Sequence, residues 1–237
     1  MRARALAVSG VLLAVLTTLV VTRWGPLSGV DLAVGRWFHG IAVAHRGLVR
    51  AADVVAVVTH PDTYRVLVVV LAAWLLWRRE AWLAFWAVLT MTVGGLAGIA
   101  GKALTARDRP RFPDPVGHAG GHSFPSGHAI NAALGVLVIL LVVLPLLRRR
   151  AARVVALVAG ALAVLVTSLD RLVLGVHYLT DVVGAWLAAV VVVAAMAMLL
   201  RLPDRPGPGL GGGRTMPVRG SGVTGSHARF RSWCLRA

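Results

Sequence analysis

Long apolar runs dominate this sequence, and they constrain its fold more than any other feature. The chain has 237 residues, 58% hydrophobic and 14% charged, and its mean hydropathy is +0.79. A water-soluble domain of this composition would expose too much apolar surface, so the runs are counted as membrane spans of about 20 residues each. Hydropathy and length predict about six spans, at residues 5–22, 64–77, 81–101, 124–147, 151–169 and 181–200. The second run is short and is expected to begin before Tyr64, near Asp62.

Basic residues separate the apolar runs and predict how the spans are oriented. In a six-span arrangement, four basic clusters fall on the same side of the membrane. They are Arg2 with Arg4, residues 78–80, residues 148–150 with Arg153, and Arg201 with Arg205. Because cytoplasmic loops carry an excess of Lys and Arg, we expect this side to be cytoplasmic, with both termini inside. The predicted fold class is all-α: a polytopic membrane bundle of about six transmembrane helices over residues 1–201.

Two further segments lie between or after the predicted spans. Residues 25–63 have apolar residues at helical spacing with charges between them, which predicts one or two amphipathic helices at the outer interface. Residues 202–237 are rich in Gly, Pro, Ser and Arg and predict a disordered, basic cytoplasmic tail. The net charge of +16 lies mostly in such connecting and tail segments, so it indicates membrane topology and not a nucleic-acid partner.

Three polar clusters lie at the predicted outer ends of the spans, and the first is KALTARDRP at residues 102–110. Lys102 and Arg109 are seven residues apart, about two helical turns, so a helix would place both on one face. Pro110 predicts that a helix ends or bends just before it. This outer segment breaks the topology rule by being basic, which suggests another role for its charges. The alternative is a basic helix end that reaches lipid headgroups.

The second cluster is PSGH, residues 125–128, at the start of the fourth apolar run. Unpaired backbone N–H groups and the helix dipole make a helix N-terminus an anion site. Ser126 is suited to the N-cap, and Gly127 allows an anion to approach the backbone closely. His128 adds a group that titrates near neutrality. The alternative is an ordinary serine cap followed by a chance histidine.

The third cluster, DRLVLGVHYLTD at residues 170–181, contains Arg171, His177 and Asp181. His177 and Asp181 are four residues apart, so on a helix they share a face and can hydrogen-bond. A carboxylate on one imidazole nitrogen fixes the tautomer and leaves the other nitrogen free to attack. The alternative is a structural Asp–His pair at the start of the last span. Together the clusters offer the cations, acid and nucleophile of phosphoryl transfer, but the residues alone do not decide which histidine attacks.

The three clusters together resemble the signature of a known family. K-x6-RP, PSGH and R-x5-H-x3-D occur here in order over residues 102–181, and they are similar to the three-part signature of the type 2 phosphatidic acid phosphatase family. The vanadium-dependent haloperoxidases share its phosphate pocket, and a membrane branch shares the six spans. One departure is Asp170, where the family often has Ser before the arginine of the third motif. This acid is positioned to pair with Arg171 and weaken its phosphate contact.

The resemblance implies a role for each matching residue. His177 would attack phosphorus to form a phosphohistidine, and Asp181 would orient it. His128 would protonate the leaving oxygen and then activate water. The residues implied to bind the phosphate are Lys102, Arg109, Ser126, Gly127 and Arg171. No cofactor and no metal is expected, because the Arg and Lys side chains supply the positive charge.

The expected function is that of a metal-independent lipid phosphatase of the plasma membrane with its site on the outer face. The expected partners are the lipid bilayer and a lipid phosphate or diphosphate, with undecaprenyl diphosphate first, since the family acts on such lipids in bacterial membranes. Phosphatidic acid or phosphatidylglycerol phosphate is the alternative substrate. A non-hydrolytic lipid-phosphate binding or transport protein is the alternative of another class, but its charges would sit near the membrane midplane. A haloperoxidase would be soluble, which this composition disfavours.

Overall fold

The computed structural model of the protein describes residues 2–202. Within this range the chain forms eight α-helices and one short 3-10 turn, η1 (Leu144–Leu146), with no strand. The helices are α1 (Arg2–Val21), α2 (Gly25–Ala44), α3 (Arg46–Val58), α4 (Pro61–Trp77), α5 (Ala81–Thr105), α6 (Gly127–Val143), α7 (Arg150–Val173) and α8 (Leu179–Leu199). All but the first residue of the predicted 202–237 tail lies outside the described residues.

Six helical stretches in the described part are long and apolar enough to cross a membrane. They are α1, the stretch Arg46–Trp77 that joins α3 to α4, α5, Gly127–Leu146, α7 and α8. The predicted all-α fold of about six spans is therefore confirmed. As expected, α4 begins before Tyr64, at Pro61. The fourth predicted span, α6, begins at Gly127 and not at residue 124, because the chain at Ser126 is extended, with φ −66° and ψ 122°.

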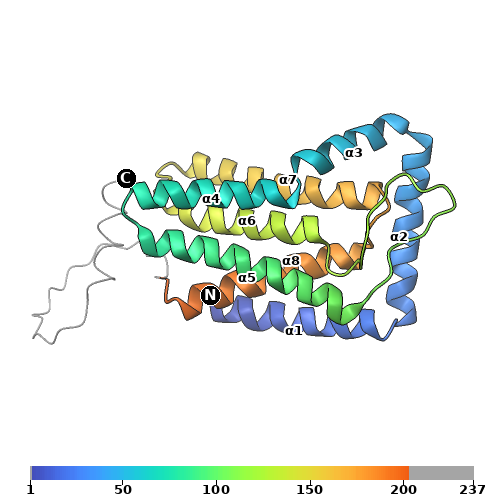
Figure 1. The fold of residues 1–237 in the computed structure, drawn as a ribbon, viewed down its shortest axis with the longest axis horizontal. Coiled ribbons are helices and arrows are strands. Elements are labelled where there is room, and N and C mark those ends of the chain that lie inside the picture. Colours follow the sequence, from blue (N-terminus) through green and yellow to red (C-terminus); the bar gives the residue numbers. More distant parts are fainter. Residues whose placement is uncertain (1, 203–237) are drawn as a thin grey trace, which may run out of the picture.

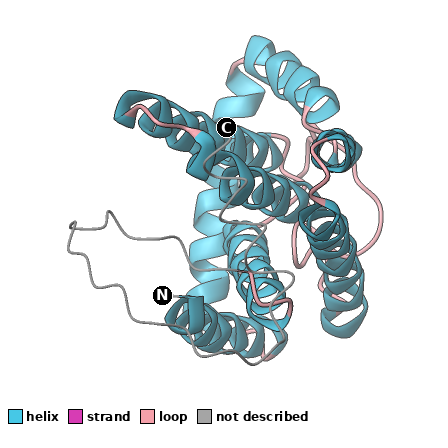
Figure 2. Ribbon diagram, turned by 90° about the vertical axis from the view of Figure 1, so that its left-hand side faces the viewer, coloured by secondary structure: helices cyan, strands magenta, loops and turns pink. Residues whose placement is uncertain are grey.

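The spanning helices lie alongside one another, and α2 crosses one end of the bundle (Figure 1). Figure 2 shows the same arrangement from the side, with α2 again upright across the bundle. At the opposite end, an Arg2 Nη1 hydrogen bond to the Leu202 carbonyl joins the start of α1 to the chain after α8. The two ends of the described chain therefore share one end of the bundle, as the predicted topology requires.

Helix α6 forms the centre of the bundle, where it contacts α4, α5, α7 and α8. Its residues are apolar around the whole circumference, which is typical of a buried helix, and Ile130, Leu134 and Val138 are fully buried. Glycines on α5 let the two helices approach closely. A Cβ added at Gly94 would lie 2.2 Å from Leu134 Cδ1, and one at Gly98 would lie 3.5 Å from Ile130 Cγ2.

The segment at residues 25–63 contains two helices, α2 and α3, and the first residues of α4. A second apolar core joins these helices to the end of α7. Its buried residues are Ala42, Val49, Ala52, Val173, Leu174 and Val176. This core fixes α2 and α3 over the end of the bundle where α5 and α7 end and α6 and α8 begin.

The prediction that Lys102 and Arg109 share a helix face is wrong. Helix α5 ends at Thr105, and Ala106 adopts the left-handed conformation with φ 44°. The Ala106 N–H still donates to the Lys102 carbonyl, and the chain then leaves the helix axis. Arg109 consequently lies in the loop that follows, so its position relative to Lys102 depends on the loop and not on helical spacing.

Candidate active site

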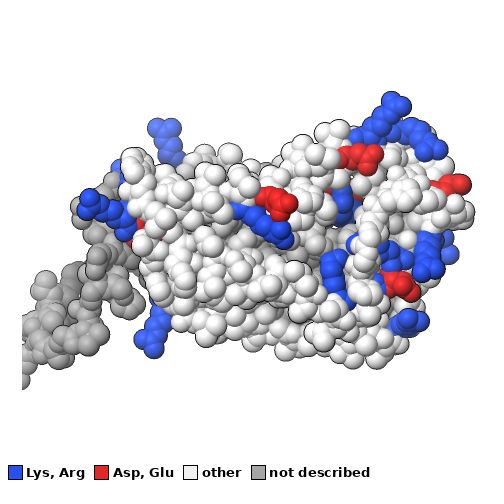
Figure 3. All heavy atoms as spheres, in the orientation of Figure 1, with Lys and Arg blue, Asp and Glu red and all other residues white. Residues whose placement is uncertain are grey.

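The three predicted clusters meet at the end of the bundle that α2 crosses, at the right in Figure 1. Helix α5 brings Lys102 to this end, α6 brings His128, and the turn between α7 and α8 brings His177. On the face drawn in Figure 3, Lys and Arg gather toward the two ends, and the surface between them is mostly uncharged apart from one adjoining basic and acidic pair. The clusters therefore lie at one margin of the apolar zone, where a membrane surface would be.

His177 and Asp181 form a buried pair. His177 Nδ1 lies 3.2 Å from Asp181 Oδ2, and the side chains are 4% and 0% exposed. His177 precedes α8 and is not part of it, so the predicted shared helix face is wrong. Asp181 instead reaches back from the first turn of α8, where its Oδ2 also accepts the Tyr178 N–H at 2.9 Å. Carboxylates are stabilised at this position because they face unpaired N–H groups and the positive end of the helix dipole.

The other nitrogen of His177 faces a cation. With Nδ1–H donating to Asp181, Nε2 is the acceptor, and Arg109 Nη1 lies 3.1 Å from it. Burial lowers the pKa of His177 below its ordinary value; Asp181 opposes this shift, and Arg109 and Lys102 reinforce it. His177 is therefore a neutral imidazole near pH 7, with its Nε2 lone pair directed at the guanidinium group. This is the protonation state that a nucleophile needs.

Lys102 and Arg109 are held by backbone carbonyls of the loop between α5 and α6 and of the turn between α7 and α8. Lys102 Nζ donates to the His122 carbonyl at 2.7 Å. Arg109 donates from Nη2 to Gly120 at 2.9 Å and from Nη1 to Val176 at 2.7 Å. Burial lowers the pKa of Arg109. The Asp181 carboxylate opposes this shift, and the Arg171 guanidinium reinforces it. The two cations thus point inward at fixed positions beside His177.

The PSGH segment meets the start of α8. Ser126 occupies the N-cap of α6, and its N–H donates to the Asp181 carbonyl at 3.1 Å. Its side chain makes no capping bond, and its buried Oγ has no hydrogen-bond partner among the described residues. Lys102 lies beside this terminus, since a Cβ added at Gly127 would be 4.0 Å from Lys102 Cε. A helix N-terminus, an unpaired hydroxyl and an ammonium group therefore meet in one place, which suits an oxyanion.

Arg171 lies between a histidine and an acid. Its Nη1 is 3.4 Å from His128 Nε2. Asp170 holds the other edge, with Oδ1 2.6 Å from Nε and Oδ2 3.0 Å from Nη2. The predicted pairing of Asp170 with Arg171 is thus present. His60, at the N-cap of α4, places its ring edge-on to His128 with centroids 5.6 Å apart.

Two further charged residues join the site and were not predicted to do so. Arg107 donates to Asp181 Oδ1 at 2.6 Å and to Asp31 Oδ2 at 2.6 Å. Asp31 belongs to α2 and is fully buried, although its segment was expected to lie at the interface. The sequence held one signal that could have identified Asp31 as a site residue. Acids are scarce, with only nine Asp and Glu in the chain, and Asp31 stands between the apolar residues Val30 and Leu32.

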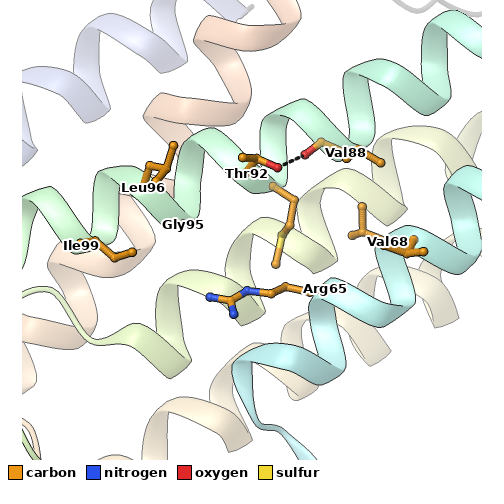
Figure 4. A pocket seen from close by; sticks show the side chains of 9 residues that line it. Arg65, Val68, Val88, Thr92, Gly95, Leu96 and Ile99 are labelled. Atoms are coloured by element: carbon orange, nitrogen blue, oxygen red, sulfur yellow. Dashed lines mark hydrogen bonds between the residues drawn. The ribbon is translucent and has the colours of Figure 1, made fainter.

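An apolar groove of about 280 Å³ runs between α4 and α5 below this end of the bundle (Figure 4). Its lining residues are Arg65, Val68, Val69, Val88, Met91, Thr92, Gly95, Leu96 and Ile99. A Cβ added at Gly95 would meet nothing within 4 Å, so this glycine borders open space and not a packed helix. Arg65 and Ile99 mark the end of the groove nearest the site, because Ile99 precedes Lys102 by one turn of α5.

Known proteins resemble this chain in sequence. A sequence model of the PAP2 superfamily matches residues 83–202, which are 120 of the 237 residues. The chain is 37% identical over 123 residues to phosphatidylglycerophosphatase B of Bacillus subtilis (strain 168), covering 51% of this chain and 59% of that protein. It is 35% identical over 109 residues to decaprenylphosphoryl-5-phosphoribose phosphatase of Mycolicibacterium smegmatis, covering 45% and 53%. The chain thus spans little more than half the length of these curated relatives.

A solved structure has a similar fold. It is the crystal structure of a transmembrane PAP2 type phosphatidylglycerolphosphate phosphatase from Bacillus subtilis, with a TM-score of 0.74. The likeness covers 84% of this chain and 98% of that chain at 20% sequence identity. At this identity the likeness concerns the fold, and it extends to nearly the whole of that membrane protein.

Proposed function

Because the chain belongs to the PAP2 superfamily, we propose that it is a metal-independent membrane phosphatase that hydrolyses a lipid phosphate through a phosphohistidine. The observation that carries the proposal is the arrangement around His177. Its Nδ1 is 3.2 Å from the Asp181 carboxylate and its Nε2 is 3.1 Å from the Arg109 guanidinium. A neutral, oriented imidazole that faces a cation is prepared to attack an anionic phosphoryl group.

The proposed reaction has two steps. In the first, the His177 Nε2 lone pair forms a bond to phosphorus while the bond from phosphorus to the lipid oxygen breaks, and His128 donates its proton to that oxygen. In the second, His128 takes a proton from water, the water oxygen bonds to phosphorus, and the bond to His177 breaks to release inorganic phosphate. Asp181 stabilises the charge on the His177 ring during both steps.

The charge of the phosphoryl group is balanced by side chains and a helix terminus. Lys102, Arg109 and Arg171 provide three positive charges, and the start of α6 provides N–H groups from Gly127 onward. The unpaired Ser126 hydroxyl supports this assignment because buried hydroxyls ordinarily have partners. Phosphoryl transfer needs mainly such positioning and charge, so the proposed reaction requires no metal ion.

The proposed substrate is a lipid whose chain lies in the membrane. The apolar groove between α4 and α5 supports this class, because it suits a hydrocarbon chain and its lining residue Ile99 precedes Lys102 by about one turn of α5. Undecaprenyl diphosphate is the first candidate. One relative acts, by its name, on a decaprenyl-linked phosphate, which is in keeping with a polyprenyl substrate. Phosphatidylglycerol phosphate is the second candidate, since another relative is named a phosphatidylglycerophosphatase. Phosphatidic acid has the same phosphate monoester chemistry.

The proposed site faces outward across the plasma membrane, with both termini in the cytoplasm. The arginines at residues 148–150 lie where α6 is joined to α7, with Arg150 as the first residue of α7, at the end opposite the site, as the positive-inside rule requires. The exposed outer-loop residue Ala119 can test this. Ala119→Cys in a Cys234→Ser background should react with a membrane-impermeant maleimide in intact cells. Labelling only after the cells are opened would contradict the orientation.

The decisive experiment measures phosphate release by the purified protein in detergent. Undecaprenyl diphosphate, phosphatidylglycerol phosphate and phosphatidic acid form the panel, with and without EDTA. His177→Ala should abolish release, EDTA should not, and His118→Ala provides an exposed control histidine in the outer loop. Release that survives in His177→Ala would contradict the mechanism. Lipid binding without any release by the wild type would favour the binding or transport alternative.

A further inference from the structure

Arg107 sits between two buried carboxylates. Its Nη1 is 2.6 Å from Asp181 Oδ1 and its Nη2 is 2.6 Å from Asp31 Oδ2. The arginine side chain is 15% exposed, and both carboxylates are 0% exposed. The Tyr178 ring covers the guanidinium group, whose carbon lies 4.3 Å from the ring centroid. Burial acts to lower the pKa of Arg107, but Asp181 and Asp31 outweigh it and raise the pKa, so this side chain stays charged.

Asp31 also holds the start of α8. Its Oδ1 accepts the Thr180 N–H at 3.0 Å, and its Oδ2 accepts the Thr180 hydroxyl at 2.6 Å. Thr180 is the second residue of α8 and immediately precedes Asp181. A residue of α2, which crosses the end of the bundle, is thereby bonded to the helix turn that carries the partner of His177. Arg107 Nη1 adds a bond to the Thr180 hydroxyl at 2.7 Å, which closes the network.

We propose that Asp31 and Arg107 are positioning residues that hold the Asp181 carboxylate so that its Oδ2 stays on His177 Nδ1. This inference rests on the proposed function. It assigns both residues to the attacking histidine, although neither touches that histidine. Asp31 lies outside the three motifs that carry the family resemblance, and Arg107 occupies an unspecified position within K-x6-RP.

The contact lengths show why the carboxylate needs this support. Asp181 Oδ1 is held by Arg107 at 2.6 Å, whereas Oδ2 is 2.9 Å from the Tyr178 nitrogen and 3.2 Å from His177 Nδ1. Charge-assisted N–H···O bonds are ordinarily about 2.7–2.9 Å, so the bond to His177 is the longest of the three. Without Arg107, the carboxylate is free to turn toward the shorter backbone contact and leave His177 unoriented.

The same network sets the electrostatic field on His177. The charged and titratable groups around this ring are Lys102, Arg109, His128, Asp181 and, behind His128, Arg171. Arg107 partly neutralises Asp181, and Asp31 partly neutralises Arg107. Removing Arg107 therefore strengthens the negative field on His177, whereas removing the charge of Asp31 weakens it. Removal of Arg107 and removal of the Asp31 charge therefore have opposite effects on the protonation of the His177 ring.

Arg107→Gln and Asp31→Asn test the inference on phosphate release. Each should lower kcat by about 10- to 100-fold, as loss of an orienting partner does, with KM unchanged because neither residue touches the phosphate. The acid limb of kcat/KM reports the free enzyme, and it should move to higher pH in Arg107→Gln and to lower pH in Asp31→Asn. The matched controls are Arg111→Gln and Asp53→Asn, both at exposed positions. These controls should behave as the wild type.

The outcomes separate positioning from a merely structural role. The inference would be overturned if Arg107→Gln and Asp31→Asn lowered thermal stability but kept kcat and the pH profile at control values. It would also be overturned if the acid limb of kcat/KM shifted in the same direction in both variants. If either variant does not fold, Thr180→Val removes only the shared hydroxyl, and it should lower kcat with KM unchanged; a wild-type kcat would overturn the inference. A wild type that releases no phosphate refutes the proposed function instead. Active wild type, inactive His177→Ala and fully active Arg107→Gln would refute the inference alone.

Discussion

Asp170 occupies one edge of the Arg171 guanidinium, where members of the family often have serine. The Asp170 side chain is 3% exposed and the Arg171 side chain is 8% exposed. The Asp170 carboxylate accepts hydrogen bonds from both Nε and Nη2 of Arg171. Only Nη1 remains directed at the site, 3.4 Å from His128. Asp170→Ser would release that edge and remove a negative charge beside the proposed phosphate pocket. The variant should therefore bind oxyanions more tightly than the wild type.

The gain in affinity follows from the bonds that are released. A hydrogen bond to a charged group contributes about 1.5–3 kcal/mol net. If the oxyanion gains one such bond from the freed edge of Arg171, its affinity rises about 10- to 150-fold. Vanadate is a suitable probe because it mimics the transferring phosphoryl group in its transition state. Its inhibition constant against lipid phosphate hydrolysis should fall by this factor in Asp170→Ser.

The same change should destabilise the protein when no oxyanion is added. Removing one partner of a buried ion pair costs about 3–5 kcal/mol. For a chain of this size each kcal/mol shifts Tm by about 2–4 °C, which gives a fall of about 6–20 °C. Vanadate should restore part of the loss, since a ligand at 100 times its Kd adds about 2.7 kcal/mol.

The assay combines thermal unfolding in detergent with vanadate inhibition of phosphate release. Asp108→Ser is the matched control, because Asp108 is 75% exposed and lies 4.0 Å from Arg111. A Tm and an inhibition constant equal to those of the control would refute the competition between Asp170 and the oxyanion. Weaker vanadate inhibition in Asp170→Ser would refute it as well, because it would show that Asp170 orients Arg171 for binding.

Three further predictions test other parts of the structure. Because burial lowers the pKa of His177, the acid limb of the pH profile of kcat/KM should lie below the ordinary histidine range. Asp181→Asn should move this limb to still lower pH and reduce kcat. A shift of the limb to higher pH in Asp181→Asn would contradict this prediction. Gly94→Ala places a Cβ 2.2 Å from a buried leucine methyl and should cost about 1–3 kcal/mol, whereas Gly95→Ala borders open space and should stabilise the helix by about 0.5–1 kcal/mol in detergent unfolding. Ser126→Ala should weaken vanadate inhibition without lowering Tm, since its Oγ has no partner among the described residues; a fall in Tm with unchanged inhibition would assign it a structural role.

The spans could be predicted because an apolar run of membrane length leaves few alternatives. Several helix ends could not, since local backbone conformation decides them. Helix α5 ends at Thr105 through the left-handed Ala106, four residues past the predicted end at residue 101. Helix α6 begins only at Gly127, after an extended N-cap. Hydropathy does not register either feature, because the residues on both sides of each boundary are compatible with a span.

The three motif clusters could be predicted as one site because residue type and spacing carried the signal. The contribution of α2 could not, since Asp31 and Arg107 are 76 residues apart and meet only through the fold. An acid in an amphipathic segment ordinarily faces water, and Asp31 is buried because α2 crosses the end of the bundle. His60 was missed for the same reason, as its approach to His128 depends on how α3 and α4 are joined.

Backbone carbonyls of the loop after α5, and one of the turn before α8, accept hydrogen bonds from the same donors that the proposed phosphate would need. Lys102 donates to His122, and Arg109 donates to Gly120 and Val176. An ionised acceptor forms hydrogen bonds roughly twice as strong as a neutral carbonyl, so a phosphate oxygen can replace a carbonyl while the donor keeps its direction. Such donors need little reorganisation during the reaction, which is the main source of electrostatic catalysis. The backbone path of this loop therefore contributes to the site as directly as the motif side chains, although no residue pattern within the loop reveals it.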